Sequence, residues 1–318
     1  MKAVASAQVG RARADDGLRC VGDAPGELDD PRSMTDPVPV EAGSGAGPDM
    51  RIGAVTLVVT NVRSALAFYA GLLGLWIHRL DDGVAALGAG DEDLIILIED
   101  REAPPADDCT GLFHLAILVP SRLELAHSLQ RVIYARRSLT GFADHLVCES
   151  LYLNDPDGNG IEIYADRPRE DWPLEDGHVR MATDPLDLYH VLTSASGRSL
   201  PPEQLELGTV IGHVHLRVAE TARAEAFYRD VIGLDVMARW KWSSILGAGG
   251  YHHHIGVNHA AGRGAPPPPP GALGMRDFEL VVGDLGPVRA RLGPAAEQDD
   301  GSLMAVDPSG NRIVLRAG

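Results

Sequence analysis

The chain has 318 residues, enough for two domains of ordinary size, and a formal net charge of −17 at pH 7. This acidic balance argues against a broad nucleic-acid surface and against binding to an anionic membrane, because both need clustered Lys and Arg. No apolar run reaches the roughly 18–20 residues that a membrane-spanning helix needs.

Residues 1–50 differ in composition from the rest of the chain. They lack the apolar core of a signal peptide, and their second half is rich in Pro, Gly and acidic residues. Such a segment buries too little apolar surface to offset its chain entropy, so we predict that it is disordered. The three cysteines, Cys20, Cys109 and Cys148, are too few for a disulfide framework or a four-cysteine zinc site. They favour a reducing, cytoplasmic location.

The first ordered elements are predicted from about residue 52. Residues 52–59 have the apolar pattern of a half-buried strand, and 63–73 have helical spacing that stops at Gly74. Three strand-like runs follow, at 75–80, 83–89 and 93–99. The first unit is therefore predicted to be a strand, a helix and three strands.

This unit recurs along the chain. Phe68-Tyr69 and Gly74-Leu75 reappear, at one constant separation, as Phe227-Tyr228 and Gly233-Leu234. The turn sequence at 155–159 (DPDGN) reappears at 307–311 as DPSGN. Four modules result, which we number one to four, at about 52–101, 111–166, 209–258 and 273–317. A polar connector with a short helix at Pro185–Thr193 is expected between modules two and three.

Module two carries two candidate metal ligands. His114 lies in its first predicted strand and Glu162 in its last. A single His on an apolar strand is more often a hydrogen-bonded core residue. The pair therefore indicates a metal site only if another module supplies a further ligand.

The repeated motifs FYxxxxGL and DPxGN resemble those of the vicinal oxygen chelate superfamily, which includes glyoxalases, bleomycin-resistance proteins and extradiol dioxygenases. The resemblance covers residues 52–317. The longer strings GHVHLRV, AGGYHHHIGVN and GIEIYADRPREDWP look more specifically like the bacterial catechol-2,3-dioxygenase branch. The resemblance implies an α+β fold in which four βαβββ modules form two open barrels, with metal ligands on a concave inner face.

The same resemblance suggests a division into domains. Residues 51–168 would form the first vicinal oxygen chelate domain, 169–208 the connector and 209–318 the second domain.

Each way of pairing the modules gives a different ligand set. The inward position of the first strand is Ala54, His114, His213 and Asp277 in modules one to four, and Val314 is the module-four counterpart of Glu162. Modules one and two together offer His114 and Glu162, whereas modules three and four offer His213 and Asp277. Only modules two and three bring together His114, Glu162 and His213. Two imidazoles and one carboxylate suit Fe(II), with Mn(II) as the alternative. We therefore predict that the middle modules share the catalytic barrel.

Further site residues follow from the extradiol resemblance. It implies an acid–base histidine within the triplet His252-His253-His254, and the register favours His253, with His254 as the alternative. Successive residues of a strand point to opposite faces, so the whole triplet cannot serve one metal. The resemblance also implies an active-site tyrosine, Tyr152, ten residues before Glu162, and a flanking His145. His215 shares a strand face with His213 and aligns with Ala116, so it is predicted to be a neighbour of the site.

The implied reaction is ring cleavage of a catechol by O2 next to one hydroxyl, giving a semialdehyde. The implied partners are a small aromatic diol and O2, without nucleic acid or membrane, and a homo-oligomer is left open. Two other functions also remain open. A glyoxalase-like isomerase or lyase would use a fourth ligand, for which the region 252–254 is a candidate. A metal-free binding protein would have no need of the set His114, Glu162 and His213.

Overall fold

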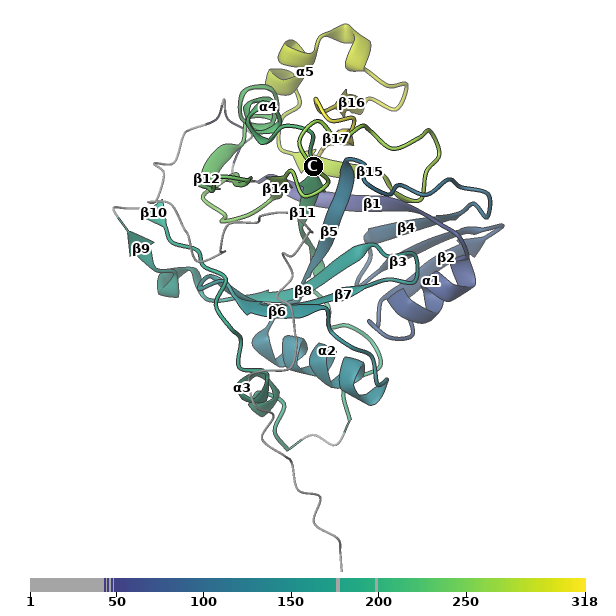
Figure 1. The fold of residues 1–318 in the computed structure, drawn as a ribbon, viewed down its shortest axis with the longest axis vertical. Helices are drawn as coiled ribbons and strands as arrows, with labels where there is room; N and C mark the ends of the chain where they lie inside the picture. Colours follow the sequence, from purple (N-terminus) through teal and green to yellow (C-terminus); the bar gives the residue numbers. More distant parts are fainter. Residues whose placement is uncertain (1–42, 44, 46, 48, 176–177, 198–199) are drawn as a thin grey trace, which may run out of the picture.

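The computed structural model describes residues 43, 45, 47, 49–175, 178–197 and 200–318. The fold is mixed α+β and mostly sheet, with two large curled sheets and a few short helices on their outer faces (Figure 1). This confirms the predicted fold class. The prediction of disorder for residues 1–50 falls almost entirely outside the described residues.

The modules follow the predicted order of elements. The first half of the chain contains β1 (Arg51–Val59), α1 (Val62–Tyr69), β2 (Trp76–Asp81), β3 (Val84–Gly88), β4 (Asp93–Glu99), β5 (Gly111–Leu118), α2 (Arg122–Tyr134), β6 (Gly141–Asp144), β7 (Cys148–Asn154) and β8 (Gly160–Asp166). The connector contains η1 (Arg169–Asp171), β9 (Leu174–Glu175), β10 (His178–Val179) and α3 (Leu188–Thr193). The second half contains β11 (Val210–Arg217), α4 (Thr221–Ala226), η2 (Phe227–Ile232), β12 (Asp235–Arg239), β13 (Ser243–Gly247), β14 (Ile255–Asn258), β15 (Gly274–Val282), α5 (Gly286–Leu292), η3 (Pro294–Ala296), β16 (Leu303–Val306) and β17 (Arg312–Ala317).

Module four departs from the pattern, because only two strands follow its helix in the described residues. The place of the first of the three strands is taken by η3 and a single bridge between Glu297 and Leu303. Pro294 at the start of η3 lacks the backbone N–H that a longer strand pairing would need.

Local chemistry explains where the helices begin and end. The Asn61 side chain accepts a hydrogen bond from the Ser64 N–H at the start of α1, and Ser121 does the same for Glu124 at the start of α2. The repeated glycines Gly74 and Gly233 have φ values of 92° and 102°, which residues with a Cβ rarely adopt. The repeated Gly-Leu motif is thus a helix-ending signal.

The order of the strands shows which modules pair. The eight-stranded sheet runs β12-β13-β14-β11-β5-β8-β7-β6, so it joins modules two and three through the antiparallel pair β5–β11. The seven-stranded sheet runs β16-β17-β15-β1-β4-β3-β2 and joins modules one and four. The predicted pairing of the middle modules is therefore confirmed. Both sheets take strands from each side of the connector, and the division into domains at 169–208 stays a prediction.

The repeated tyrosines link modules that are adjacent in sequence. The Tyr69 hydroxyl donates to Asp155 Oδ2 at 2.8 Å, and Tyr228 donates to Asp307 Oδ2 at 3.2 Å. Both tyrosines are fully buried. Each therefore connects the helix segment of one module to the DPxGN turn of the next, in addition to filling the core.

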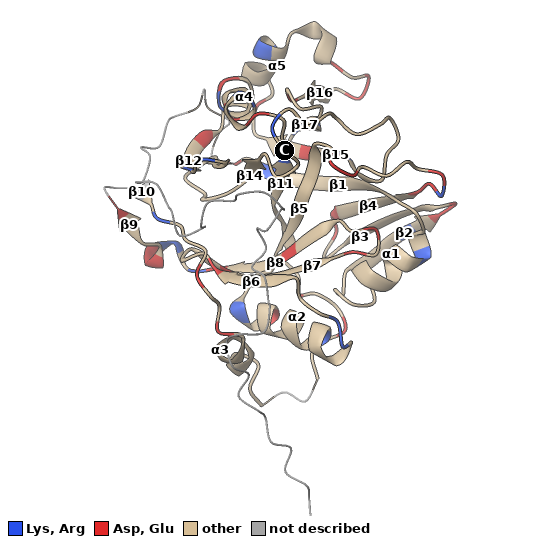
Figure 2. Ribbon diagram, in the orientation of Figure 1, with Lys and Arg blue, Asp and Glu red and all other residues tan. Residues whose placement is uncertain are grey.

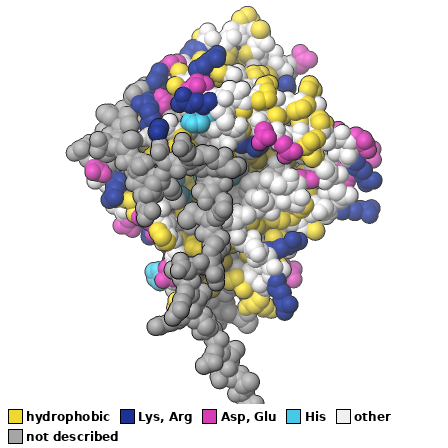
Figure 3. Space-filling model, viewed as in Figure 1, with side chains coloured by type: hydrophobic (Ala, Val, Ile, Leu, Met, Phe, Trp, Pro, Cys, Tyr) yellow, Lys and Arg dark blue, Asp and Glu magenta, His cyan; other side chains and the backbone are white. Residues whose placement is uncertain are grey.

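Charged residues lie mainly at strand ends and in loops, while most of the length of the strands consists of residues other than Lys, Arg, Asp and Glu (Figure 2). On the face shown in Figure 3, Lys and Arg form small separate groups among acidic and hydrophobic side chains. No helix in the described part of the chain is long and apolar enough to cross a membrane.

The sheet order predicts the result of a truncation. A protein that ends after residue 170 keeps modules one and two but loses one of the two partner strands of both β1 and β5, namely β15 and β11. We expect it to lose both metal binding and the near-ultraviolet circular dichroism of a packed core. A truncated protein that still bound one equivalent of divalent metal would contradict the placement of one ligand on β11.

Candidate metal centre and active-site cavity

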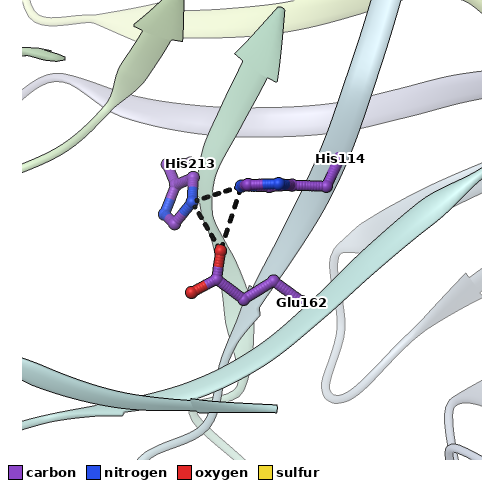
Figure 4. Close-up of side chains that lie close together, drawn as sticks. All are labelled: His114, Glu162 and His213. Atoms are coloured by element: carbon purple, nitrogen blue, oxygen red, sulfur yellow. Dashed lines mark hydrogen bonds and ion pairs between the residues drawn. The ribbon is translucent and has the colours of Figure 1, made fainter. Parts of the chain in front are cut away.

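Three neighbouring strands at the centre of the eight-stranded sheet present three ligand-type side chains to one point. His114 lies on β5, Glu162 on β8 and His213 on β11. His114 Nε2 and His213 Nε2 lie 3.0 and 3.1 Å from Glu162 Oε2, and 3.3 Å from each other (Figure 4). All three residues are buried. The residues predicted from separate modules are thus brought together.

The spacing of these three atoms fits a bound divalent cation. Adjacent ligands of a six-coordinate ion with bonds of about 2.1 Å are separated by about 3.0 Å. If both imidazoles donated a hydrogen bond to the same carboxylate oxygen, their two N–H groups would be forced against each other. A cation would instead accept one lone pair from each imidazole nitrogen and one from the carboxylate oxygen. His213 Nδ1 is also buried without a hydrogen-bond partner among the described residues. The donor set of two imidazoles and one carboxylate therefore fits a metal site better than a closed hydrogen-bond cluster.

The ionisation states also suit a metal. Burial lowers the pKa of His213 to about 4, although Glu162 partly opposes the shift, so the imidazole is neutral at pH 7. Burial disfavours the charged form of Glu162, but His213 and His114 outweigh it and hold the pKa of that carboxyl well below its usual range. A neutral imidazole and an ionised carboxylate are the forms that bind divalent cations.

A cavity of about 170 Å³ opens over this centre. Pockets for drug-sized ligands usually have about 300–1,000 Å³, so this one suits a molecule of a single ring. Its walls combine the three ligand-type residues with aromatic, apolar and histidine side chains. Those used below are His145, Cys148, Tyr152, Trp242, His252 and His253.

The histidine triplet lies in the loop just before β14, not on a strand as predicted, and each ring has a different environment. His252 Nε2 pairs with Asp166 Oδ1 at 2.9 Å, and His254 Nδ1 accepts the Ala248 N–H at 3.1 Å. His253 stacks on His213, with ring centroids 3.7 Å apart and planes 18° apart. Of the two candidates, His253 faces the cavity and His254 does not.

The His253 ring is held by its surroundings and still has a free nitrogen. Its Nε2 is buried without a hydrogen-bond partner among the described residues. Burial, followed by His213 and His215, lowers the pKa of His253 well below its usual value, so the ring is neutral. A Cβ at position 256 would lie 2.6 Å from His215 Nδ1 and 2.8 Å from His253 Nε2. Gly256 is therefore required for the close approach of these rings, a role that no motif in the sequence revealed.

Tyr152 and His145 form a hydrogen-bonded pair on the opposite wall. His145 Nδ1 donates to the Ala182 carbonyl at 2.7 Å, so in the neutral ring Nε2 accepts the Tyr152 O–H at 2.8 Å. The β7–β8 pairing sets Tyr152 directly opposite Glu162. Both predicted residues thus line the cavity next to the metal ligands.

His215 is a neighbour of the centre, as predicted. Its Nε2 accepts a hydrogen bond from the Asn258 Nδ2 amide at 3.0 Å, and its ring centroid lies 4.9 Å from that of His114. Its Nε2 lone pair is therefore already used, so this atom is not available as a metal ligand.

A second cluster, Cys148, Asp166 and His252, lies near the same cavity. Burial, followed by Glu162 and Asp166, raises the pKa of the Cys148 thiol well above its usual value. A protonated thiol is a poor metal ligand, and Asp166 already pairs with His252. The cluster is therefore better described as support for the histidine loop.

The other sheet has no comparable group. Ala54 and Val314 carry no ligand atom, and Asp277 pairs with Arg276 at 2.6 Å. In the described part of the chain, no cluster of three metal-ligating residues lies in modules one and four.

Comparison with known proteins gives the family. The profile of the glyoxalase/bleomycin resistance protein/dioxygenase superfamily matches residues 51–163 and 210–292, more than half of the chain. The chain belongs to this superfamily. A catechol-2,3-dioxygenase of Bacillus subtilis (strain 168) is 40% identical over 243 residues, which cover 74% of this chain and 83% of that protein. This relative supports a dioxygenase-like role for the superfamily member described here.

Solved structures of the superfamily share the fold. A putative dioxygenase from Bacillus subtilis superposes with a TM-score of 0.55 at 15% identity, covering 84% of each chain. Glyoxalase I from Zea mays superposes with a TM-score of 0.52 at 17% identity, covering 84% of this chain and 92% of its own. At these identities the likeness concerns the fold alone.

Proposed function

We propose that this protein is an Fe(II)-dependent extradiol dioxygenase that opens the ring of a catechol with O2. The observation that carries the proposal is the convergence of His114, Glu162 and His213 beneath a cavity that suits a molecule of one ring. Three protein ligands on one side leave positions open for the two substrate oxygens and for O2. The relative named catechol-2,3-dioxygenase supports the same reaction class.

The three ligand residues would hold Fe(II), with Mn(II) as the alternative. When bound, the metal would bring the diol and O2 together and let electron density pass from the ring to oxygen. The protein residues around it would bind, orient and deprotonate the substrate.

His253 is proposed as the acid–base group. Its unpartnered Nε2 in the cavity wall can accept a proton from a catechol hydroxyl and return it to the product. Stacking on His213 fixes the ring next to the metal ligands. Tyr152 would hydrogen-bond a substrate oxygen, and His145 holds the Tyr152 hydroxyl in place.

The triplet region does not favour the glyoxalase-like alternative. A fourth ligand from residues 252–254 would have to lie with the other three, yet His252 is paired with Asp166 and His254 with Ala248. The stacked His253 ring lies alongside the His213 ring and does not point at the shared centre.

The proposed function is tested by anaerobic loading with Fe(II), followed by addition of catechol and O2. We expect one metal per chain, consumption of one O2 per catechol and the absorbance of a ring-opened semialdehyde. The same protein loaded with Zn(II), which has no redox chemistry, is the control and should consume no O2. A loaded protein that binds catechol but consumes no O2 would refute the proposal.

A further inference from the structure

A second, larger cavity adjoins the metal centre. It has a volume of about 580 Å³, and its lining shares His114, Tyr152, His215 and Trp242 with the inner cavity. The two cavities therefore border each other at these four residues, one of which is the candidate ligand His114. A substrate that consisted only of a dihydroxylated ring would fill the inner cavity and leave this outer one to water.

Arg217 is the charged side chain of interest in the outer cavity. It lines the cavity at the end of β11, and its guanidinium makes no hydrogen bond or ion pair with any residue that the structure describes. Its Nε is fully buried without a partner. Burial lowers the pKa of the Arg217 guanidinium, in keeping with its partly buried position. A partly buried arginine is normally paired with an anion, because its charge is costly to desolvate.

The fold itself does not require an arginine at this position. The corresponding residues of the other three modules are Val58, Leu118 and Val281, all aliphatic. An aliphatic residue can therefore occupy the end of this strand in the same type of module. The cation of Arg217 is specific to module three, which also contributes to the metal centre.

The strand geometry relates Arg217 to the centre. His213, His215 and Arg217 alternate along β11 and share its inner face, and β11 pairs with β14 without a register shift from Val214 to Arg217. At about 3.3 Å per residue, the Arg217 backbone lies about 13 Å along the strand from that of His213. The cavity wall also includes the apolar side chains of Phe113, Trp242 and Met275.

We propose that Arg217 binds a carboxylate carried on a side chain of the catechol, so that the substrate class is an aromatic diol with an acidic side chain. This assignment rests on the proposed catechol chemistry. The diol would lie over the metal ligands, the methylene chain against the apolar wall, and the carboxylate on the guanidinium, which can bind it with two parallel hydrogen bonds.

The acidic residues near Arg217 do not form an ion pair with its guanidinium. Asp107 and Asp108 lie close enough to favour the charged form of Arg217, but neither forms an ion pair with it. Asp157, another acid of the cavity wall, is bound by the backbone and side chain of Thr60. The guanidinium therefore remains available to a ligand.

The test compares an acid with its neutral ester. Anaerobic calorimetry measures binding of 3-(3,4-dihydroxyphenyl)propionate and its methyl ester to the metal-loaded and the metal-free protein. The wild type should bind the acid more tightly than the ester. Arg217→Leu, which copies the module-two residue, should lower the ratio of acid to ester affinity about 10–100-fold, the range expected for a charge-assisted pair. Arg217→Lys should give a smaller loss.

Control measurements distinguish carboxylate binding by Arg217 from the proposed dioxygenase activity. Arg79→Leu removes an exposed arginine on β2 and should leave the ratio unchanged. Equal losses for acid and ester in Arg217→Leu, or a wild type that binds both equally, would overturn the proposal. Oxygen uptake on unsubstituted catechol is measured alongside. If uptake is absent while the acid still depends on Arg217, the dioxygenase proposal fails and the carboxylate site stands.

Discussion

Replacing His114, His213 or Glu162 with alanine should reduce bound metal and oxygen uptake to background in each case. Each change removes one of the three converging candidate ligands, whose ligand atoms lie within 3.3 Å of one another, and leaves only two of them to hold a metal. Glu162→Gln keeps the volume of the side chain and removes its charge, so it should also lose the metal. The measurements are metal content after anaerobic loading and the O2-uptake rate with catechol.

Two further measurements distinguish loss of a metal ligand from loss of the fold and from a general effect of removing a nearby histidine. The near-ultraviolet circular dichroism of each variant should remain that of the folded protein, because the sheet pairing does not depend on these side chains. His215→Ala should retain the metal, because His215 Nε2 is already bonded to Asn258. If His215→Ala lost the metal and His213→Ala kept it, the assignment of the ligand on β11 would be wrong.

His253→Asn should keep the metal and still bind catechol, while turnover falls by about 10²–10⁴-fold, the usual contribution of a positioned proton-transfer group. The ring is not among the three converging ligands, so its removal leaves the centre complete. The His253 ring lines the cavity and its Nε2 has no hydrogen-bond partner among the described residues, so loss of the imidazole should slow proton transfer. Steady-state O2 uptake and metal content are measured on the same preparation.

The substrate can reveal whether the lost function is proton transfer. 4-Nitrocatechol gives up its proton unaided because the nitro group acidifies it, so the loss in His253→Asn should be smallest for this substrate. Equal losses on catechol and 4-nitrocatechol would argue against an acid–base role. His254→Asn is the matched control, because His254 faces away from the cavity, and it should change the rate much less.

Much of the fold could be predicted from local patterns in the sequence. The recurrence of Phe-Tyr, Gly-Leu and DPxGN defined the modules, because each motif has a local structural role. Gly74 and Gly233 supply a positive φ at a helix end, and Asp155 accepts two backbone N–H groups of its own turn. The ligand types also pointed to the correct module pairing, since at the aligned inward positions of the strands only modules two and three together offer two imidazoles and a carboxylate.

Other features depended on the tertiary structure. The three adjacent histidines 252–254 have three different environments because their partners come from different parts of the chain. Asp166 pairs with His252 and the His213 ring stacks on His253, both from distant strands, whereas His254 accepts a backbone N–H from its own loop. A loop has no fixed alternation of side chains, so sequence spacing could not assign these directions. The need for Gly256 is likewise set by two histidine rings that meet across the strand.

The sequence by itself determined the modules, their helices and strands, and the residue types available for a metal. Only the tertiary structure decided which of His253 and His254 faces the cavity, how the ligand atoms converge, and that Arg217 lies in the adjoining cavity without a partner among the described residues. The physical reason is the range of the interactions. Apolar periodicity and turn chemistry act between near neighbours and are read along the chain, whereas the environment of a buried polar group is set by strands that meet only after the sheet has formed.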